Sequence, residues 1–476
     1  MAGHSTHEKY HEPIEWEGSL TIGELLARQL FGTDGIRGVA GEPPLDHHTA
    51  HALGYALGSW ACQHRPSAAE TPEVVIGMDT RESGPWLAEQ VAGGLARAGV
   101  NARFAGIITT PGVAYLTRTG SYVAGVMISA SHNPYYDNGL KVISHSGYKL
   151  PDATELELEK LMADWLGTGQ PAEPRPLEAD PALDNLYTDY LAGTVSGAFP
   201  LRIVVDCANG SAARVAPHLF KRLGCEVDWL GTLPDGRNIN LNCGSLHLEH
   251  VQKRVLETRA DLGIAFDGDA DRALFVAGSG RIVDGDAVLF LAGNSLKRKG
   301  RLNGNVVVAT VMSNLGLEKA LESEGIQMLR TPVGDKYVLE EMIRRGAVLG
   351  GEQSGHVIFS EYATTGDGIL TSLRVLEIIR DSESSLDDLA DRIKTFPQKL
   401  VNVRVKHKRP LAELESVQAE IQAAEDEFAG SGRVVVRFSG TEPLARVMIE
   451  AGSQEQVDKW TGRIAEAIRA ELGSAN

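Results

Sequence analysis

The chain has 476 residues, of which 43% are hydrophobic and 23% are charged, an ordinary composition for a soluble protein with several hydrophobic cores. Its formal net charge of −17 argues against a nucleic-acid or anionic-membrane partner, because phosphate-rich surfaces attract basic proteins. The four cysteines form no C-x-x-C pair, and neither a membrane span nor a signal-peptide core is evident, so we expect a cytoplasmic protein with free thiols.

The first region expected along the chain is a flexible N-terminal extension, residues 1–29, which is rich in His and Glu. Beyond it, one pattern recurs, in which an apolar strand is followed by a helix, a terminating glycine and a second strand. The pattern occurs at residues 74–107, 201–230 and 306–330. Apolar β-branched strands that alternate with helices predict three tandem, related α/β domains with mixed, mainly parallel sheets.

The C-terminal region has a different pattern. Residues 400–405 and 433–437 alternate like half-exposed strands, and residues 454–472 have the spacing of a long amphipathic helix. This combination predicts a smaller α+β domain after the three α/β domains. The predicted domain boundaries are residues 30–195, 196–298, 299–395 and 396–476.

Four loops carry residue types suited to chemistry, and the first contains Ser131 and His132 directly after an apolar strand. A serine hydroxyl is a weak nucleophile unless a base or a metal assists it, and His132 and Lys141 are candidates for that help. A Ser-His pair in a turn is by itself usually a structural coincidence. Asn133, Pro134 and Gly139 are typical of a shaped loop and favour the functional interpretation.

The second loop follows another apolar strand and carries Asp267, Asp269 and Asp271 at alternate positions. Alternate side chains of extended backbone point the same way, so the three carboxylates can converge on one ion. All-oxygen ligation suits Mg²⁺, and three like charges are unfavourable without a cation. An EF-hand is excluded because Arg272 and Gly278 stand where Gly and Glu are needed.

The third loop, GGEQSGH, offers Glu352 and Ser354 as hydrogen-bonding groups for a sugar diol, although it is alternatively an ordinary turn. Earlier in the chain, the segment FGTDGIRG places Arg37 between flexible glycines, from which its side chain can reach an active-site phosphate. Taken alone, this segment is a surface turn. The chain has no G-x-x-x-x-G-K-[ST] motif, so a nucleotide is not the evident phosphoryl donor.

The fourth loop is rich in groups that bind anions. Two guanidiniums, two hydroxyls and the backbone amides around a glycine form a candidate phosphate cradle. The alternative is a helix N-cap formed by one of the hydroxyls. The residues concerned are Arg437, Ser439, Gly440, Thr441 and Arg446.

Together these motifs resemble the α-D-phosphohexomutases. FGTDGIRG, ISASHNPYYDNGLK, AFDGDADR, GGEQSGH and RFSGTEPLARVM occur in the order of that superfamily and cover nearly the whole chain from Phe31 onward. Within it, TPGVAYLTR, DGRNINLNCGSLH, ATVMSNLGLE and Gln353 before Ser354 are similar to the bacterial phosphoglucosamine mutase branch.

The resemblance implies a heart-shaped, four-domain fold with a central cleft. It implies interconversion of glucosamine 6-phosphate and glucosamine 1-phosphate through a phosphoserine enzyme and a sugar bisphosphate, a step toward UDP-N-acetylglucosamine and cell-wall precursors. The expected partner is a hexosamine phosphate, with neither nucleic acid nor membrane, and the expected assembly is a monomer or a homodimer.

By similarity, each loop also receives a role. Ser131 carries the phosphoryl group and joins the three Asp residues around one Mg²⁺, and His132, Lys141 and Arg37 support proton transfer and phosphate charge. The expected substrate-binding residues are Arg272, Glu352, Ser354, Arg437, Ser439, Gly440, Thr441 and Arg446. Lys141 is expected to act as a base if burial and Arg37 lower its pKa, and the fourth domain is expected to close on the phosphate.

Three features depart from the family pattern. Ala270 replaces the usual Gly of the aspartate loop, and it would strain that loop if the position requires a positive φ. Leu246 replaces a usual Thr, and the first 29 residues precede the usual start. Two alternatives stay open: the same chemistry on mannose or glucose phosphates, and a non-catalytic sugar-phosphate-binding protein. A phosphatase would require free access of water to the phosphoserine.

Overall fold

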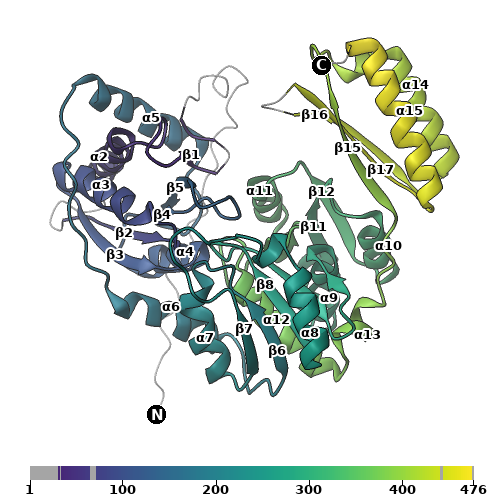
Figure 1. Cartoon of the computed structure of the whole chain (residues 1–476), viewed down its shortest axis with the longest axis horizontal. Coiled ribbons are helices and arrows are strands. Elements are labelled where there is room, and N and C mark those ends of the chain that lie inside the picture. The colour runs from purple at the N-terminus through teal and green to yellow at the C-terminus, as the bar shows by residue number, and fades with distance from the viewer. Residues whose placement is uncertain (1–29, 33, 65–70, 440–442, 474–476) are drawn as a thin grey trace.

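The computed structural model describes residues 30–32, 34–64, 71–439 and 443–473, so the predicted N-terminal extension lies outside the described residues. Four sheets follow one another along the described chain (Figure 1). The first three carry helices on both sides, and the fourth is smaller and antiparallel. This arrangement confirms the predicted class of three α/β domains followed by an α+β domain.

The first sheet has the strand order β1-β5-β4-β2-β3. Its centre is parallel, because β2 pairs in parallel with both β3 and β4, whereas β5 runs antiparallel to β4 and to β1. The strands are β1 (Ile36–Val39), β2 (Glu73–Met78), β3 (Asn101–Ile107), β4 (Ala124–Ile128) and β5 (Asp137–Ser144). The helices are α2 (His47–His64), α3 (Gly84–Arg97), α4 (Thr110–Thr119), α5 (Asp152–Gly167) and α6 (Pro181–Gly193).

The second sheet repeats this plan with the order β10-β9-β8-β6-β7 and a parallel centre around β6. Its strands are β6 (Arg202–Asp206), β7 (Glu226–Leu230), β8 (Leu262–Phe266), β9 (Ala273–Ala277) and β10 (Ile282–Val283). Its helices are α7 (Ala212–Arg222) and α8 (Glu249–Thr258), whereas the next helix, α9 (Gly285–Arg298), packs mainly against the third domain.

The third sheet has the order β12-β11-β13-β14, again with a parallel centre. Its strands are β11 (Val306–Thr310), β12 (Gln327–Thr331), β13 (Leu349–Gly351) and β14 (Val357–Phe359). Its helices are α10 (Leu315–Ser323), α11 (Asp335–Arg345), α12 (Gly368–Ser382) and α13 (Leu386–Ala390). The second and third sheets share one continuous hydrophobic core, so these two domains form a single packed body.

The C-terminal domain contains a three-stranded antiparallel sheet of order β15-β17-β16. Its elements are β15 (Gln398–Arg404), α14 (Glu415–Phe428), β16 (Arg433–Phe438), β17 (Leu444–Glu450) and α15 (Gln454–Leu472). Both helices cover one face of this sheet and enclose a separate core that includes Phe428 and Trp460. None of the helices in the described part of the chain combines the length and apolar character needed to cross a bilayer.

The C-terminal domain meets the rest of the molecule at the third domain. Asn314 exchanges two hydrogen bonds with the backbone of Phe396 at 2.9 and 3.0 Å. Arg433 donates to the carbonyl of Ser313 at 2.7 Å and pairs with the buried carboxylate of Glu450. In Figure 1 this domain lies on the opposite side of the molecule from the first domain. Its position is therefore set by a short polar junction.

Candidate active site

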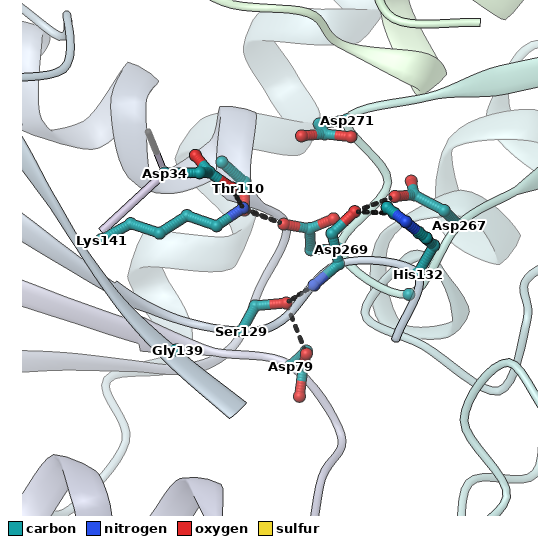
Figure 2. A network of polar contacts seen from close by, with 12 residues as sticks. Asp34, Asp79, Thr110, Ser129, His132, Gly139, Lys141, Asp267, Asp269 and Asp271 are labelled. Atoms are coloured by element: carbon teal, nitrogen blue, oxygen red, sulfur yellow. Dashed lines mark hydrogen bonds and ion pairs between the residues drawn. The ribbon is translucent and has the colours of Figure 1, made fainter. Parts of the chain in front are cut away.

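Ser131 lies in the loop between β4 and β5 and is 2% exposed. Its hydroxyl donates to Oδ2 of Asp267 at 2.5 Å, and Nδ1 of His132 lies 3.3 Å from the hydroxyl oxygen of Ser131 (Figure 2). Ser131 and Asp267 are separated by more than a hundred residues in the sequence and come from different sheets. The structure therefore brings the candidate nucleophile directly to the aspartate loop.

The aspartate loop follows β8, and its three carboxylates converge as expected. One oxygen each of Asp267, Asp269 and Asp271 lies within 4.8 Å of the others, and all three residues are buried. Oδ1 of Asp269 and Oδ1 of Asp271 are buried and have no hydrogen-bond partner among the described residues. Burial and the neighbouring charges of Asp271 and Asp269 raise the pKa of Asp267 well above its usual value. Unpaired hard oxygens and mutual repulsion are the conditions that a bound divalent cation relieves.

Asp269 is held from the first domain by Lys141 and Thr110. Nζ of Lys141 lies 2.9 Å from Oδ2 of Asp269, and the Thr110 hydroxyl donates to the same oxygen at 2.5 Å. Burial lowers the pKa of Lys141, but the carboxylates of Asp269 and Asp34 outweigh burial and raise it. The condition of a lowered pKa is therefore not met. The two carboxylates raise the pKa of Lys141 more than burial and the charge of Arg37 lower it, so the ammonium keeps its proton.

A series of polar contacts, here called the polar ring, links the aspartate loop to the first and third domains, and its two ends, Asp269 and Asp271, are carboxylates of the candidate metal site. Successive members lie 2.6 to 3.9 Å apart. The members are Asp269, Lys141, Asp34, Lys149, Asp335, His356 and Asp271. Burial lowers the pKa of His356, but the carboxylates of Asp271 and Asp335 outweigh burial and raise this pKa to about 9. Nδ1 of the imidazole lies 3.6 Å from Asp271, and Nε2 lies 3.9 Å from Asp335.

Two arginines and His132 complete the surroundings of Ser131. Arg37 pairs with Asp34, and the Arg272 amide donates to Oδ1 of Asp267 at 3.1 Å. Burial, together with the positive charges of Arg272 and Arg37, lowers the pKa of His132 to about 4. The imidazole is therefore neutral near pH 7 and is able to accept a proton or a hydrogen bond.

A cavity of about 420 Å³ opens where the first three domains meet. Three loops line it together: the loop of Ser131 and His132, here called the serine loop, the aspartate loop, and the GGEQSGH loop with Glu352, here called the sugar loop. Glu352 faces this cavity and accepts a hydrogen bond from the Gly334 amide at 3.2 Å. The Ser354 hydroxyl is buried without a hydrogen-bond partner among the described residues. The cavity therefore combines acidic, basic and hydroxyl groups of the kind that a phosphorylated sugar requires.

The fourth loop is not part of this cavity. Arg437 and Arg446 lie opposite each other on β16 and β17, and Ser439 is buried beside them at the end of β16. Burial and the charge of Arg446 lower the pKa of Arg437. None of the described residues of this loop lines the cavity, and Gly440 and Thr441 lie outside the described residues. The structure thus assembles three of the four predicted loops and leaves the fourth on a separate domain.

Comparison with known proteins agrees with this four-part arrangement. Four phosphoglucomutase/phosphomannomutase domain descriptions match in order: alpha/beta/alpha domains I, II and III and the C-terminal domain. They match residues 28–166, 185–280, 284–396 and 400–467. The chain belongs to the phosphoglucomutase/phosphomannomutase family.

Full-length relatives refine the position within this family. The phosphoglucosamine mutase of Solibacter usitatus is 58% identical over 449 residues, covering 94% of this chain and 100% of that protein. The phosphoglucosamine mutase of Koribacter versatilis is 52% identical, covering 96% of this chain and 100% of that protein. A crystal structure of a phosphoglucomutase/phosphomannomutase family protein from Burkholderia thailandensis superposes with a TM-score of 0.77 at 27% identity, covering 93% and 98% of the two chains.

The two departures from the family pattern have different structural outcomes. Ala270 has a φ of +55°, so the aspartate loop does require left-handed backbone at this position and alanine adopts it at a cost of about 1 kcal/mol. Its amide donates to Asp267 and its carbonyl accepts from Gly368, which fix the turn. Leu246 is 55% exposed and does not line the cavity, so this replacement leaves the site unchanged.

Sequence reasoning missed the residues that support the loops. Asp34, Lys149 and Asp335 belong to the polar ring; Asp34 lies in FGTDGIRG without an assigned role, and the other two stand outside the motifs that carried the resemblance. Thr110 and Asn240 lie in TPGVAYLTR and DGRNINLNCGSLH, segments that carried the resemblance without an assigned chemistry. Polar residues in segments that identify a family but carry no assigned role are the available signal for such supporting groups.

Proposed function

We propose that this protein interconverts glucosamine 6-phosphate and glucosamine 1-phosphate through a phosphoserine at Ser131 and a hexosamine bisphosphate. Relatives named phosphoglucosamine mutase, 58% and 52% identical over almost the whole chain, support this substrate. The observation that carries the chemistry is the 2.5 Å contact between the Ser131 hydroxyl and Asp267. The product serves UDP-N-acetylglucosamine synthesis.

We further infer that Asp267, Asp269, Asp271 and the Ser131 oxygen hold one Mg²⁺. The donor set consists of hard oxygens, and two buried carboxylate oxygens are free to accept an ion. When bound, Mg²⁺ supplies positive charge that offsets the negative charge of the transferred phosphoryl group. Lys141 holds Asp269 in place at 2.9 Å, and its charge complements that of the carboxylates.

Each phosphoryl transfer exchanges one P–O bond for another. From phospho-Ser131, the bond between phosphorus and the serine oxygen breaks while a bond between phosphorus and a sugar hydroxyl oxygen forms; in net terms the proton of that hydroxyl passes to the departing serine oxygen. In the return step the serine oxygen is the nucleophile and gives its proton back to the departing sugar oxygen. Asp267 accepts a hydrogen bond from the Ser131 hydroxyl, and neutral His132 lies 3.3 Å from the same hydroxyl oxygen as a second acceptor. Between the two steps the bisphosphate turns round, so that the other phosphoryl group faces Ser131.

The remaining residues position the sugar phosphate. Glu352, Ser354 and Arg272 are proposed to hold the sugar in the cavity where the first three domains meet. The charge of Arg37 is proposed to attract the reacting phosphate. The other phosphate is proposed to bind at Arg437, Ser439, Gly440, Thr441 and Arg446. Because this last group lies on the C-terminal domain, that domain must approach the cavity for both ends of the sugar to be held.

The deciding experiment compares initial rates on glucosamine, mannose and glucose 6-phosphates, with Ser131→Ala as the control. We expect glucosamine 6-phosphate to have the highest kcat/KM and Ser131→Ala to be inactive on all three. Mass spectrometry of the active enzyme should locate phosphate on Ser131. A preference for mannose or glucose phosphate would assign a different sugar, whereas binding without turnover or a fully active Ser131→Ala would contradict the mechanism.

A further inference from the structure

The backbone at Ser131 adopts a conformation that serine avoids. Its φ of +52° lies in the left-handed region, where a residue with a Cβ is destabilised by about 1 kcal/mol or more. Strained backbone of this kind persists only where surrounding contacts hold it. Side chains contact both the amide and the carbonyl of Ser131, and they come from two domains.

The amide of Ser131 is held from the first domain. It donates to Oγ of Ser129 at 2.9 Å, and the Ser129 hydroxyl in turn donates to Oδ2 of Asp79 at 2.5 Å (Figure 2). Asp79 is fully buried at the end of β2 and forms an ion pair with Arg81. The amide therefore rests on a chain of buried groups anchored in the sheet.

The carbonyl of Ser131 is held by two donors. An NH₂ group of Arg81 donates to the carbonyls of Ser131 and Asn133 at 3.1 and 2.6 Å. Nδ2 of Asn240 donates to the same two carbonyls at 2.9 and 3.0 Å. Arg81 is 1% exposed. One NH₂ group of its planar guanidinium pairs with Asp79, and the other donates to the serine loop. A guanidinium suits this division because its donors have fixed directions.

Asn240 belongs to the second domain, which also supplies the aspartate loop. A Cβ on Gly268 would lie 2.6 Å from the carbonyl oxygen of Ser131 and 2.9 Å from Nδ2 of Asn240. The aspartate loop therefore packs against the same carbonyl that Asn240 and Arg81 hold. The hydrogen bonds of Asn240 and Arg81 thus fix the position of the serine loop relative to the candidate metal-binding carboxylates of the neighbouring domain.

We propose that Asn240 and Arg81 are positioning residues that hold Ser131 in its left-handed conformation and thereby aim its hydroxyl at the aspartate loop. This inference rests on the proposed phosphoserine function. Ser131 must both donate and accept a phosphoryl group in each catalytic cycle, and a loop that relaxed between the two steps would misplace the reacting oxygen. The hydrogen bonds to its amide and carbonyl leave the hydroxyl itself available for chemistry.

The chain offers a matched pair of substitutions to test this. Asn240 has a φ of +58°, so Asn240→Gly keeps the backbone conformation while removing only the side-chain amide. Asn242 has a φ of +53° in the same loop, and its exposed side chain makes no hydrogen bond to any described residue. Asn242→Gly is therefore the control for the glycine substitution. Arg81→Lys provides a second test, because it keeps a positive charge beside Asp79 but removes the second NH₂ group, which donates to the carbonyls of Ser131 and Asn133.

The measurements are kcat and KM for glucosamine 6-phosphate, the unfolding temperature, and the rate at which Ser131 takes up label from glucosamine 1,6-[³²P]bisphosphate. Two lost hydrogen bonds are expected to lower kcat and the labelling rate about tenfold in Asn240→Gly, with KM within about twofold. Arg81→Lys should show the same split between kcat and KM. Asn242→Gly should match the unchanged enzyme in every measurement.

The outcomes separate this proposal from the proposed function. If the unchanged enzyme takes no label at Ser131, the phosphoserine function itself fails. If it is labelled, but Asn240→Gly and Arg81→Lys are labelled at the same rate, the positioning role is overturned. A lower unfolding temperature with an unchanged kcat per folded molecule would make both residues structural only and would equally overturn it.

Discussion

The first three domains and the C-terminal domain hold their functional loops in different ways. In the former, side chains from separate sheets touch: Ser131 contacts Asp267, and Lys141 contacts Asp269. In the latter, Arg437 and Arg446 lie on a separate sheet with its own core, joined to the third domain by a polar junction. The reacting centre is therefore pre-assembled, whereas the proposed phosphate-binding residues lie outside it and would have to reach it by movement of their domain.

This difference assigns separate tasks to the two regions. Groups that must be placed within tenths of an ångström for bond exchange are packed between the first three domains, where neighbouring contacts restrict them. Under the proposed mechanism, the residues that hold the non-reacting phosphate need less exact placement, because the bisphosphate turns round and the product leaves. Substitutions in the pre-assembled region should therefore change kcat or stability, and those in the C-terminal domain should change KM.

The largest effect is expected from Asp267→Asn, which alters the pre-assembled centre. Loss of a metal ligand and of the Ser131 proton acceptor should lower kcat/KM about 1,000-fold. In EDTA the same variant should unfold at a higher temperature than the unchanged enzyme, because burial and two neighbouring carboxylates oppose the charge of Asp267 and raise its pKa. Activity assays and thermal unfolding, with Mg²⁺ or with EDTA, measure both. Retained activity, or a lower unfolding temperature in EDTA, would count against the metal site.

A pH-dependent effect on stability is expected at Asp367, the buried N-cap residue of α12. Its carboxylate accepts a hydrogen bond from the Tyr187 hydroxyl at 2.7 Å. Burial raises the pKa of Asp367 to about 6, so the native state holds a proton that the unfolded state releases near pH 3.8. The contribution of Asp367 to the free energy of unfolding is fully present below about pH 3.8 and is lost as the pH rises through about 6. Relative to the unchanged enzyme, Asp367→Asn should gain up to about 3 kcal/mol in unfolding free energy between pH 4 and pH 7.5. Urea unfolding at several pH values tests this, and a difference independent of pH would refute it.

The C-terminal domain is tested by Arg437→Ala. Removing one charge-assisted phosphate contact of about 2 kcal/mol should raise KM for glucosamine 6-phosphate about 30-fold and change kcat much less. Arg463→Ala is the control, because Arg463 belongs to the same domain but pairs with Glu420 between the two helices. A fall in kcat with constant KM would mean that this domain takes part in bond exchange, and the contrast between the two regions would fail.

The smallest effect is expected from Lys149→Met, which opens the polar ring between the first and third domains. Lys149 lies 2.6 Å from both Asp34 and Asp335. Its loss removes the shorter ionic contact of Asp335, which keeps only His356 at 3.9 Å among the described residues, whereas Asp34 keeps Arg37 and Lys141. We expect a loss of about 1–2 kcal/mol in unfolding free energy. Lys299→Met removes an exposed ion pair with Asp381 and should cost less than about 0.5 kcal/mol. Equal effects in urea unfolding would show that the ring adds nothing to the domain contact.

The sequence predicted the elements well where local patterns decide them. The helix expected at residues 454–472 matches α15, and the strand expected at residues 226–230 matches β7. The convergence of Ser131 with the aspartate loop followed from the rule that ligand-binding loops lie at the carboxyl ends of parallel strands. Periodicity and motif order carry this information because both are local along the chain.

The parts that sequence reasoning missed depend on contacts between distant segments. The pKa of Lys141 was expected to fall, but the position of Asp34 and Asp269 around its ammonium raises it. That position arises only when the first two domains pack together. Sequence analysis placed Arg437 and Arg446 in a separate C-terminal domain, but the orientation of that domain was not predictable, since motif order does not encode how one domain lies relative to another.

The polar ring has a consequence for how this enzyme can change over time. Lys149 lies 2.6 Å from both Asp34 and Asp335. Replacing Lys149 alone therefore leaves Asp335 with His356, at 3.9 Å, as its nearest ionic partner among the described residues. Tolerated replacements at Lys149 and Asp335 should therefore arise together, for example as an apolar pair, and rarely one at a time. A selection from a library randomised at both positions should recover such linked pairs, making this contact a conservative element of the fold.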